Sequence, residues 1–306
     1  MLRALTFCFV LITLGWLTAP AFAEDADGAT PQVFFKLVSS NNPSSYGDPV
    51  DFTAILPEGT AGTVTFKIDS ATISTVPVSN GQANYRTSEL PLGQHRITAV
   101  FSGEEEQKSF SAELTQTVHQ ADPTVVLYCN PNWSIFGEPI ECEVTLPADA
   151  SGTVTFLDDV RPLGRKAAGN GQVSFTAPRL GAGSHLLTAS YSGDSNFLPS
   201  NGRQTQTILQ ADTNVGVSCY PAPAYYWETV TCTAEVAPFA TGTITATDAG
   251  LVVAKIPLAD GIAVWSGTAL DVGYHHIGAT YPGDANHRGN NASFNLNVID
   301  PEQWIQ

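Results

Sequence analysis

Hydrophobic and polar residues alternate in short runs along most of the chain. At 152–156, for example, valine and phenylalanine alternate with threonine, the period of two expected for a strand with one buried face. No stretch shows a sustained helical period bounded by helix caps. Across residues 121–210 the alternation predicts seven strands, near 124–129, 139–146, 152–157, 162–166, 172–177, 184–192 and 203–210. The pattern therefore predicts an all-β protein.

The same pattern returns every 90 residues without net insertion or deletion. The motif Gly-Thr-Val-Thr-Phe at 62–66 recurs at 152–156 and, as Gly-Thr-Ile-Thr, at 242–245. A period of this length suits whole domains rather than solenoid repeats. We therefore divide the chain into repeats at 31–120, 121–210 and 211–302, followed by a tail at 303–306. Each repeat also carries a two-residue hairpin signal, in which both residues need positive φ: Asn80-Gly81, Asn170-Gly171 and Asp260-Gly261.

Seven short strands in about 90 residues predict an immunoglobulin-like β-sandwich. Each repeat also resembles the bacterial immunoglobulin-like repeat domains of exported and cell-surface proteins. The resemblance rests on Tyr46–Thr53, on the Gly-Thr-Val-Thr-Phe motif, on Leu-x-x-Gly-x-His and on Tyr191–Asn196, and closure by Leu114–Val118 also fits. It covers nearly all of the chain after residue 23, and it implies a spacer, adhesive or stalk role.

The first 23 residues have the composition of a secretory signal peptide. Arg3 is their only charge, residues 4–17 are largely apolar, and Ala21-Phe22-Ala23 matches a small-x-small cleavage site. After Glu24 no apolar run approaches the length of a membrane span. We therefore expect three tandem immunoglobulin-like domains after a cleaved signal peptide, with 24–30 as a lead segment. The predicted location is extracellular or cell-surface associated, with the periplasm as the alternative.

Four cysteines follow the signal: Cys129, Cys142, Cys219 and Cys232. An even number in an exported chain predicts disulfides. The two members of each pair are 13 residues apart, which is too close for the bond between strands B and F of immunoglobulin domains. The spacing instead predicts Cys129–Cys142 and Cys219–Cys232, each linking the end of strand A to strand B. The alternative, a zinc site, would need four converging ligands, whereas the two cysteine pairs lie in different repeats.

Charge limits the classes of partner. Only 14% of the 306 residues are charged, and 29 acidic residues outnumber 13 basic ones, for a formal net charge of −16. This excludes a nucleic-acid binder that works through clustered cations, and it disfavours anionic membrane surfaces. The third repeat is the most acidic, with Lys255 and Arg288 as its only cations apart from histidine. We expect a partner to meet this repeat.

No motif predicts catalysis or a cofactor. The chain lacks Gly-x-Ser-x-Gly, His-Glu-x-x-His and phosphate-loop motifs, and its cysteines after residue 23 are all expected to be paired. One histidine occupies the same position in each repeat: His95, His185 and His275. Because separate domains keep these histidines tens of ångströms apart, we expect them to be structural rather than metal ligands.

Three aromatic residues are additions to the repeat, and they are our candidate binding residues: Trp133, Tyr225 and Trp227. Aromatic rings held on a disulfide-closed loop can anchor a protein partner or stack on the sugars of a cell-surface glycan. The alternative is that they cover the end of a sandwich or pack on the neighbouring domain. The equivalent residues Tyr46, Phe136 and Tyr226 are expected in the core.

A glycine turn carries acidic and amide oxygens in the second and third repeats. Asp194 with Asn196, and Asp284 with Asn286, are therefore weak candidates for a Ca²⁺ site, whereas no other metal site is predicted. The alternative is a turn in which the side chain bonds its own backbone.

Between repeats the chain has no Gly/Ser linker, only Gln120–Pro123 and Gln210–Thr213. We therefore expect a stiff rod on the order of 100–120 Å long. The predicted function is a non-catalytic, exported, structural or adhesive interaction module. Two alternatives stay open: a carbohydrate-binding protein that uses the loop aromatics, and a periplasmic or secreted accessory domain of a larger assembly.

Overall fold

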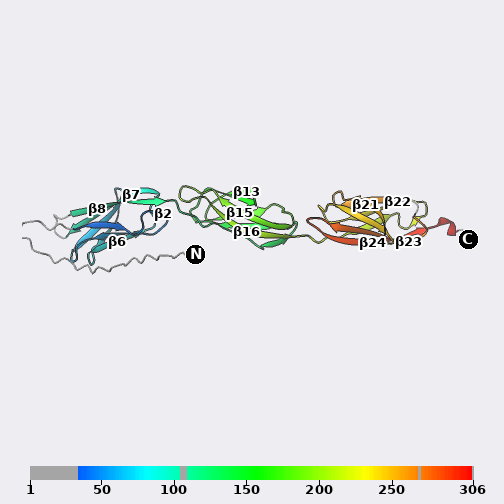
Figure 1. Ribbon diagram of the computed structural model, residues 1–306, viewed down its shortest axis with the longest axis horizontal. Coiled ribbons are helices and arrows are strands. Elements are labelled where there is room, and N and C mark those ends of the chain that lie inside the picture. Colours follow the sequence, from blue (N-terminus) through cyan, green and yellow to red (C-terminus); the bar gives the residue numbers. More distant parts are fainter. Residues whose placement is uncertain (1–33, 104–108, 268–269, 305–306) are drawn as a thin grey trace, which may run out of the picture. The chain divides into compact units, whose positions relative to one another are not determined.

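The computed structural model describes residues 34–103, 109–267 and 270–304. The predicted signal peptide and lead segment, residues 1–30, lie outside the described residues. Within the described ranges the chain forms 24 strands and one 3₁₀ helix, Pro301–Trp304. The strands build three β-sandwiches, coloured blue to cyan, green, and yellow to red in Figure 1. The expected all-β fold with three tandem immunoglobulin-like sandwiches is confirmed.

Each sandwich contains eight strands in the same order. Sandwich 1 has β1 (Lys36–Ser39), β2 (Ser44–Ser45), β3 (Val50–Ile55), β4 (Gly62–Ile68), β5 (Ala71–Pro77), β6 (Gln82–Thr87), β7 (Gly93–Gly103) and β8 (Ser109–His119). Sandwich 2 has β9 (Val126–Cys129), β10 (Trp133–Ile135), β11 (Ile140–Thr145), β12 (Thr153–Asp158), β13 (Arg161–Ala167), β14 (Gln172–Ala177), β15 (Gly183–Tyr191) and β16 (Ser200–Leu209). Sandwich 3 has β17 (Gly216–Tyr220), β18 (Ala224–Tyr225), β19 (Val230–Glu235), β20 (Thr243–Asp248), β21 (Leu251–Pro257), β22 (Ile262–Gly267), β23 (Gly273–Gly283) and β24 (Arg288–Ile299).

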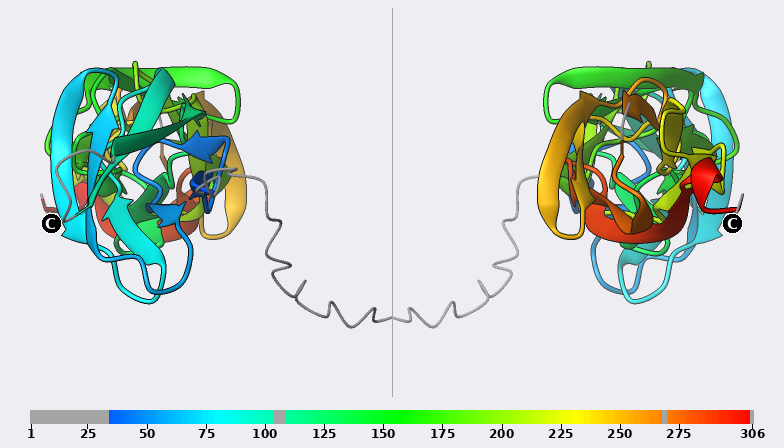
Figure 2. Two further views of the ribbon diagram at one scale, coloured as in Figure 1. Left: turned by 90° about the vertical axis from the view of Figure 1, so that its left-hand side faces the viewer. Right: turned by 90° about the vertical axis from the view of Figure 1, so that its right-hand side faces the viewer.

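Two sheets face each other in every sandwich. The three-stranded sheets have the orders β1-β3-β6, β9-β11-β14 and β17-β19-β22, and the five-stranded sheets are β2-β8-β7-β4-β5, β10-β16-β15-β12-β13 and β18-β24-β23-β20-β21. Pairing is antiparallel except where the short strands β2, β10 and β18 run parallel to the last strand of their sandwich. Figure 2 views the chain with sandwich 1 nearest the reader on the left and sandwich 3 nearest on the right.

The period of two places alternate side chains in the core. In β11, for example, Ile140, Cys142 and Val144 are buried while the residues between them are exposed. In sandwich 2 the rings of Phe156 and Phe175 stack at 4.0 Å between centroids, with an interplanar angle of 6°. Burying apolar side chains in this way is the main favourable contribution to the stability of each sandwich.

All seven strands predicted for residues 121–210 are present. The prediction missed β10, because a strand of three residues is too short to show alternation. This strand pairs with β16, so Trp133 lies on a strand and not in a free loop. No α-helix occurs in the ranges that the structure describes.

The predicted two-residue turns have the expected backbone. Asn80 and Gly81 have φ of 53° and 71°, and the equivalent residues of the other sandwiches are similar. The hairpin, however, extends for only one bridge, Ser79 to Gln82, because the strands on either side, β5 and β6, belong to different sheets. The turn therefore carries the chain from one sheet to the other.

Contacts between Cα atoms divide the chain into two compact units. One contains most of sandwich 1, namely the described residues up to Ser40, Asp51–Tyr85 and the described part of Arg96–Leu114. The other contains Asn41–Val50, Arg86–His95 and everything from Thr115 onward. Sandwiches 2 and 3 thus belong to one unit, together with three segments of sandwich 1, one of which contains Tyr46.

Candidate functional site

Both predicted disulfides are formed in the structure. Cys129 at the end of β9 lies directly opposite Cys142 in β11, with Cα atoms 4.1 Å apart. Cys219 and Cys232 repeat this arrangement between β17 and β19, at 4.0 Å. In sandwich 1 the same register pairs Ser39 with Phe52. Each bond therefore joins the first strand of its sandwich to the neighbouring strand, as the 13-residue spacing indicates.

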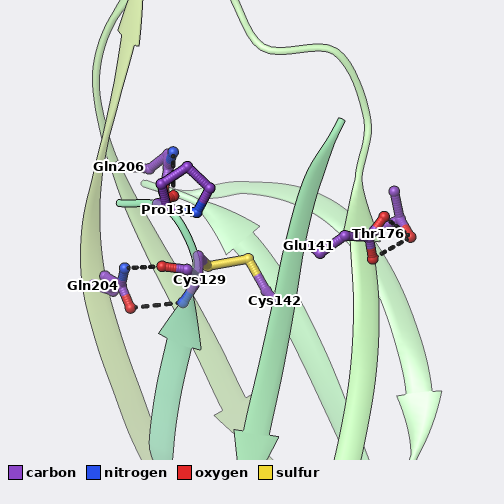
Figure 3. Close-up of a disulfide and its surroundings, with 7 residues drawn as sticks. All are labelled: Cys129, Pro131, Glu141, Cys142, Thr176, Gln204 and Gln206. Carbon is purple, nitrogen blue, oxygen red and sulfur yellow. Dashed lines mark hydrogen bonds between the residues drawn. A yellow bond between two sulfur atoms is a disulfide. The ribbon is translucent and has the colours of Figure 1, made fainter. Parts of the chain in front are cut away.

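Two glutamines on β16 hold the chain around the first disulfide (Figure 3). The Gln204 side chain accepts a hydrogen bond from the Cys129 N–H and donates one to the Cys129 carbonyl, both at 2.8 Å. The buried Gln206 donates to the carbonyl of Pro131 at 3.2 Å. Sandwich 3 has Phe294 and Leu296 at these positions, so its disulfide-closed loop lacks both clamps. Our sequence prediction missed these glutamines, although Gln116 and Gln206 stand 90 residues apart.

The three repeated histidines each fasten a strand to the loop before it. Nε2 of His185 lies 2.8 Å from the carbonyl oxygen of Gly181, and its Nδ1 lies 2.9 Å from the Asp158 carboxylate. His275 makes the same pair of contacts with Asp271 and Asp248, at 2.7 and 2.6 Å. Burial lowers the pKa of His275, but the hydrogen bonds to Asp271 and Asp248 outweigh this and raise it.

None of the three residues at repeat position 46/136/226 is fully buried. Tyr46 and Phe136 are half-buried and pack against the core of sandwich 2, whereas Tyr226 is 44% exposed, so the expected core position was wrong for Tyr226. Phe136 is half-buried, and its ring meets the ring of His287 in sandwich 3 edge-on, with centroids 5.2 Å apart. The Arg179 guanidinium lies over Phe136 and, at 4.1 Å, over the ring of Phe239 in sandwich 3. These contacts form a joint between sandwiches 2 and 3.

Hydrogen bonds complete this joint. The Asn286 side-chain oxygen accepts a bond from the Ala182 N–H at 2.8 Å. Ala211 in the connecting segment donates its N–H to the carbonyl of Asn286 and accepts from the N–H of Arg288, both at 2.9 Å. Gln210 donates to the carbonyl of Asp284 at 2.9 Å. The turn at 284–287 therefore forms hydrogen bonds both to the loop of sandwich 2 that contains Ala182 and to the connecting segment.

Tyr46 makes the equivalent contacts one repeat earlier. Its ring meets Phe197 edge-on at 5.6 Å, and its hydroxyl donates to the Asp149 carboxylate at 2.9 Å. Phe197 and His287 are 90 residues apart, as are Asp149 and Phe239. The same ring position thus meets the same turn at both places, and all of these residues lie in the second compact unit.

At Tyr226 the ring position is open. Its side chain is 44% exposed, and the described residues include no further sandwich that could cover it. The neighbouring candidates are also accessible, Tyr225 at 47% and Trp227 at 63%, and their rings lie 6.4 Å apart with an interplanar angle of 17°. Trp133, at 51% exposed, lies apart from them on β10 of sandwich 2. The structure thus brings Tyr225 and Trp227 together but leaves Trp133 separate.

The backbone turn that carries this position is the same in all three sandwiches. Glu228 donates its N–H to the carbonyl of Tyr225, and its carboxylate accepts the Tyr225 N–H. Glu138 and Asp48 do the same for Ile135 and Ser45. The turn therefore holds Tyr226 on the same scaffold that presents Tyr46 and Phe136.

The weak Ca²⁺ candidates are occupied by turn hydrogen bonds. Asp194 Oδ1 accepts the N–H groups of Asn196 and Phe197, at 2.7 and 2.9 Å. Its Oδ2 accepts from the N–H of Ser151 and the hydroxyl of Tyr191. Burial raises the pKa of Asp194, but these donors outweigh it and lower the pKa to about 2. The geometry favours the turn alternative, and the described residues contain no cluster of three or more His, Cys, Asp or Glu that could hold a metal ion.

The family is decided by a match that covers most of the chain. The model for the bacterial Ig-like domain (group 3) matches residues 37–119, 128–209 and 217–299. The chain belongs to this bacterial Ig-like family. No curated protein matches it.

Solved structures similar to this bacterial Ig-like protein are distant. They include a titin I-band fragment, I67–I69, with 11% identity over 89% of this chain and 100% of that one, at a TM-score of 0.33. The ICAM-5 D1–D4 fragment shows 12% identity over 87% and 77%, at 0.36, and the fibronectin(III)-like modules of Clostridium thermocellum CbhA show 14% over 58% and 96%, at 0.26. At such values they say nothing about function. No helix in the described part of the protein is long and apolar enough to cross a membrane.

Proposed function

We propose that this bacterial Ig-like protein is an exported, non-catalytic structural and adhesive module whose contact surface is the open end of sandwich 3. This end, which we call the aromatic end, consists of Tyr225, Tyr226 and Trp227. The observation that carries the proposal is the exposure of Tyr226, because the equivalent rings Tyr46 and Phe136 are covered by the next sandwich. Exposed aromatic rings on a fixed turn are typical anchors of protein interfaces.

Two features support export. Residues 1–23 have the pattern of a signal peptide, and each of two sandwiches contains a disulfide. Disulfides persist in oxidising compartments such as the periplasm and the cell exterior. The acidic third repeat adds a preference for partners that are not strongly acidic.

A second candidate function is glycan binding. Tyr225 and Trp227 are exposed and their ring planes are nearly parallel, and an exposed aromatic face can stack on a sugar ring. Trp133 does not share this platform, so it is not expected to contribute. A protein partner and a glycan would use overlapping residues of the aromatic end.

A binding screen of the chain from residue 24 against proteins and glycans tests both candidates. We expect Trp227→Ala to weaken binding by tenfold or more, the usual effect at an aromatic anchor. Trp133→Ala is the matched control, because it removes another exposed tryptophan, which lies in sandwich 2. Binding that survives Tyr225→Ala and Trp227→Ala together would show that the aromatic end is not the contact surface.

A further inference from the structure

The two inner joints show what covers the ring position when it is filled. At both places the ring meets an aromatic residue that follows the sequence Asp-x-Asn: Phe197 after Asp194-Ser195-Asn196, and His287 after Asp284-Ala285-Asn286. The turn is rigid, because its aspartate accepts the backbone N–H groups of the asparagine and of the aromatic residue. The ring and the Asp-x-Asn turn are therefore the two halves of one contact.

Among the residues that the structure describes, no turn meets the ring of Tyr226 in sandwich 3. We infer that Tyr226 docks the end of a separate bacterial Ig-like sandwich, one whose facing turn has the sequence Asp-x-Asn followed by an aromatic residue. This inference rests on the proposed function and names the partner class for the same surface. It concerns Tyr226, whereas the glycan candidate concerns the stacked pair Tyr225 and Trp227.

The hydroxyl group of Tyr226 indicates which residue the partner should present to it. Tyr226 has the hydroxyl that Phe136 lacks, and the hydroxyl of Tyr46 donates to Asp149 at 2.9 Å. A partner with a carboxylate at the position of Asp149 therefore matches Tyr226 better than one with an aromatic residue there, such as Phe239. The face of sandwich 2, with Asp149, Asn196 and Phe197, is the closest match found within this chain.

The segment after sandwich 3 lacks one backbone donor of the inner joints. Ala121 and Ala211 donate their N–H groups to the carbonyls of Asn196 and Asn286. The equivalent residue is Pro301, which has no N–H and begins a 3₁₀ helix. A sandwich docked on Tyr226 therefore depends more on side-chain contacts than the inner joints do.

A second copy of this chain does not offer the required face. In the described residues the turns at 194–197 and 284–287 are already covered by the preceding sandwich. At the same repeat position sandwich 1 has Glu104-Glu105-Glu106-Gln107, which contains no Asp-x-Asn and no aromatic residue. We therefore expect the full chain not to associate head to tail with itself.

The test mixes the full chain with a probe that exposes the matching face. The probe is residues 121–306 with Tyr226→Ala, which frees the face of sandwich 2 and removes the probe's own ring. The buried core residues of sandwich 2 all lie between Leu127 and Ile208, and from the described part of sandwich 1 the cluster has only the partly buried Tyr46 packed against it. Its two disulfides and its β-type circular dichroism confirm that the probe is folded.

We expect a one-to-one complex in sedimentation velocity and calorimetric titration. Because the contact is small, it should be weak. Tyr226→Ala in the full chain should weaken it at least tenfold, and Asp149→Ala in the probe should weaken it as well. Trp133→Ala in the full chain should leave it unchanged.

A folded probe that does not bind, or that binds the Tyr226→Ala chain equally well, overturns the inference. If the probe does not bind but Trp227→Ala still abolishes binding of another protein or of a glycan, the proposed function stands and this partner class is wrong. If no ligand of any class depends on the aromatic end, both fail.

Discussion

Sandwiches 2 and 3 have the same topology and an equivalent disulfide, yet they differ in the number of further contacts that stabilise each of them. Sandwich 2 has a stacked phenylalanine pair in its core, where a cavity of only about 10 Å³ remains. Sandwich 3 has Ala246 and the half-buried Trp265 at these positions, and therefore no such stacked pair. In sandwich 2, Gln204 and Gln206 form hydrogen bonds to the disulfide-closed loop, and the ring of Phe136 contacts sandwich 3. In sandwich 3 both glutamines are absent, and the ring of Tyr226 is exposed. Stability and contact surface are thus distributed unequally between two copies of one fold.

The largest expected effect comes from giving sandwich 2 the core residue of sandwich 3. Phe156→Ala removes one ring of the stacked pair and leaves a cavity in a closely packed core. We expect it to lower the free energy of unfolding of sandwich 2 by about 3–5 kcal/mol. Urea unfolding, followed through amide signals of sandwich 2, measures the change. A loss below about 1 kcal/mol would show that this stack is not what distinguishes the two cores.

Removing a disulfide should have the next largest effect. Each bond closes a short loop, and its loss is expected to cost about 3 kcal/mol. In sandwich 3 no glutamine clamp remains, so Cys219→Ala with Cys232→Ala should also weaken binding at the aromatic end. Cys129→Ala with Cys142→Ala is the matched control, because it leaves that end unchanged. Peptide mapping without reductant checks the pairing, and a Cys129–Cys219 link would contradict it.

A smaller effect is expected from the clamp itself. Gln204→Leu introduces the residue that sandwich 1 has at this position, Leu114, and removes two hydrogen bonds to Cys129. The expected loss in the stability of sandwich 2 is about 1–2 kcal/mol. The exposed neighbour Arg203→Ala serves as the control. Equal stability of the two variants would mean that the disulfide alone holds this loop.

The smallest effect is a pH dependence of sandwich 3. The folded-state pKa of His275 is raised, so its contribution to stability is complete below the unfolded value of about 6.5. The contribution is lost as the pH rises through the folded pKa. His275→Gln should flatten this part of the stability profile measured by thermal unfolding. A profile with the same slope in both proteins would assign the dependence to another group.

The repeat explains why most of the fold was predictable. Alternation located every strand of sandwich 2 except β10, and the 13-residue spacing located both disulfides. The joints were not predictable, because a half-buried ring that faces a neighbouring domain follows the same alternation as a core ring. Tyr46, Phe136 and Tyr226 were for this reason assigned to the core. Only the contacts with Phe197 and His287 separate the two cases.

The central claim is that one ring position is covered at two repeats and open at the third. Hydroxyl-radical footprinting of the intact chain, read by mass spectrometry, measures this directly. We expect Tyr226 and Trp227 to be oxidised at rates typical of exposed rings, and Tyr46 and Phe136 to be protected. Protection of Tyr226 equal to that of Tyr46 would contradict the account.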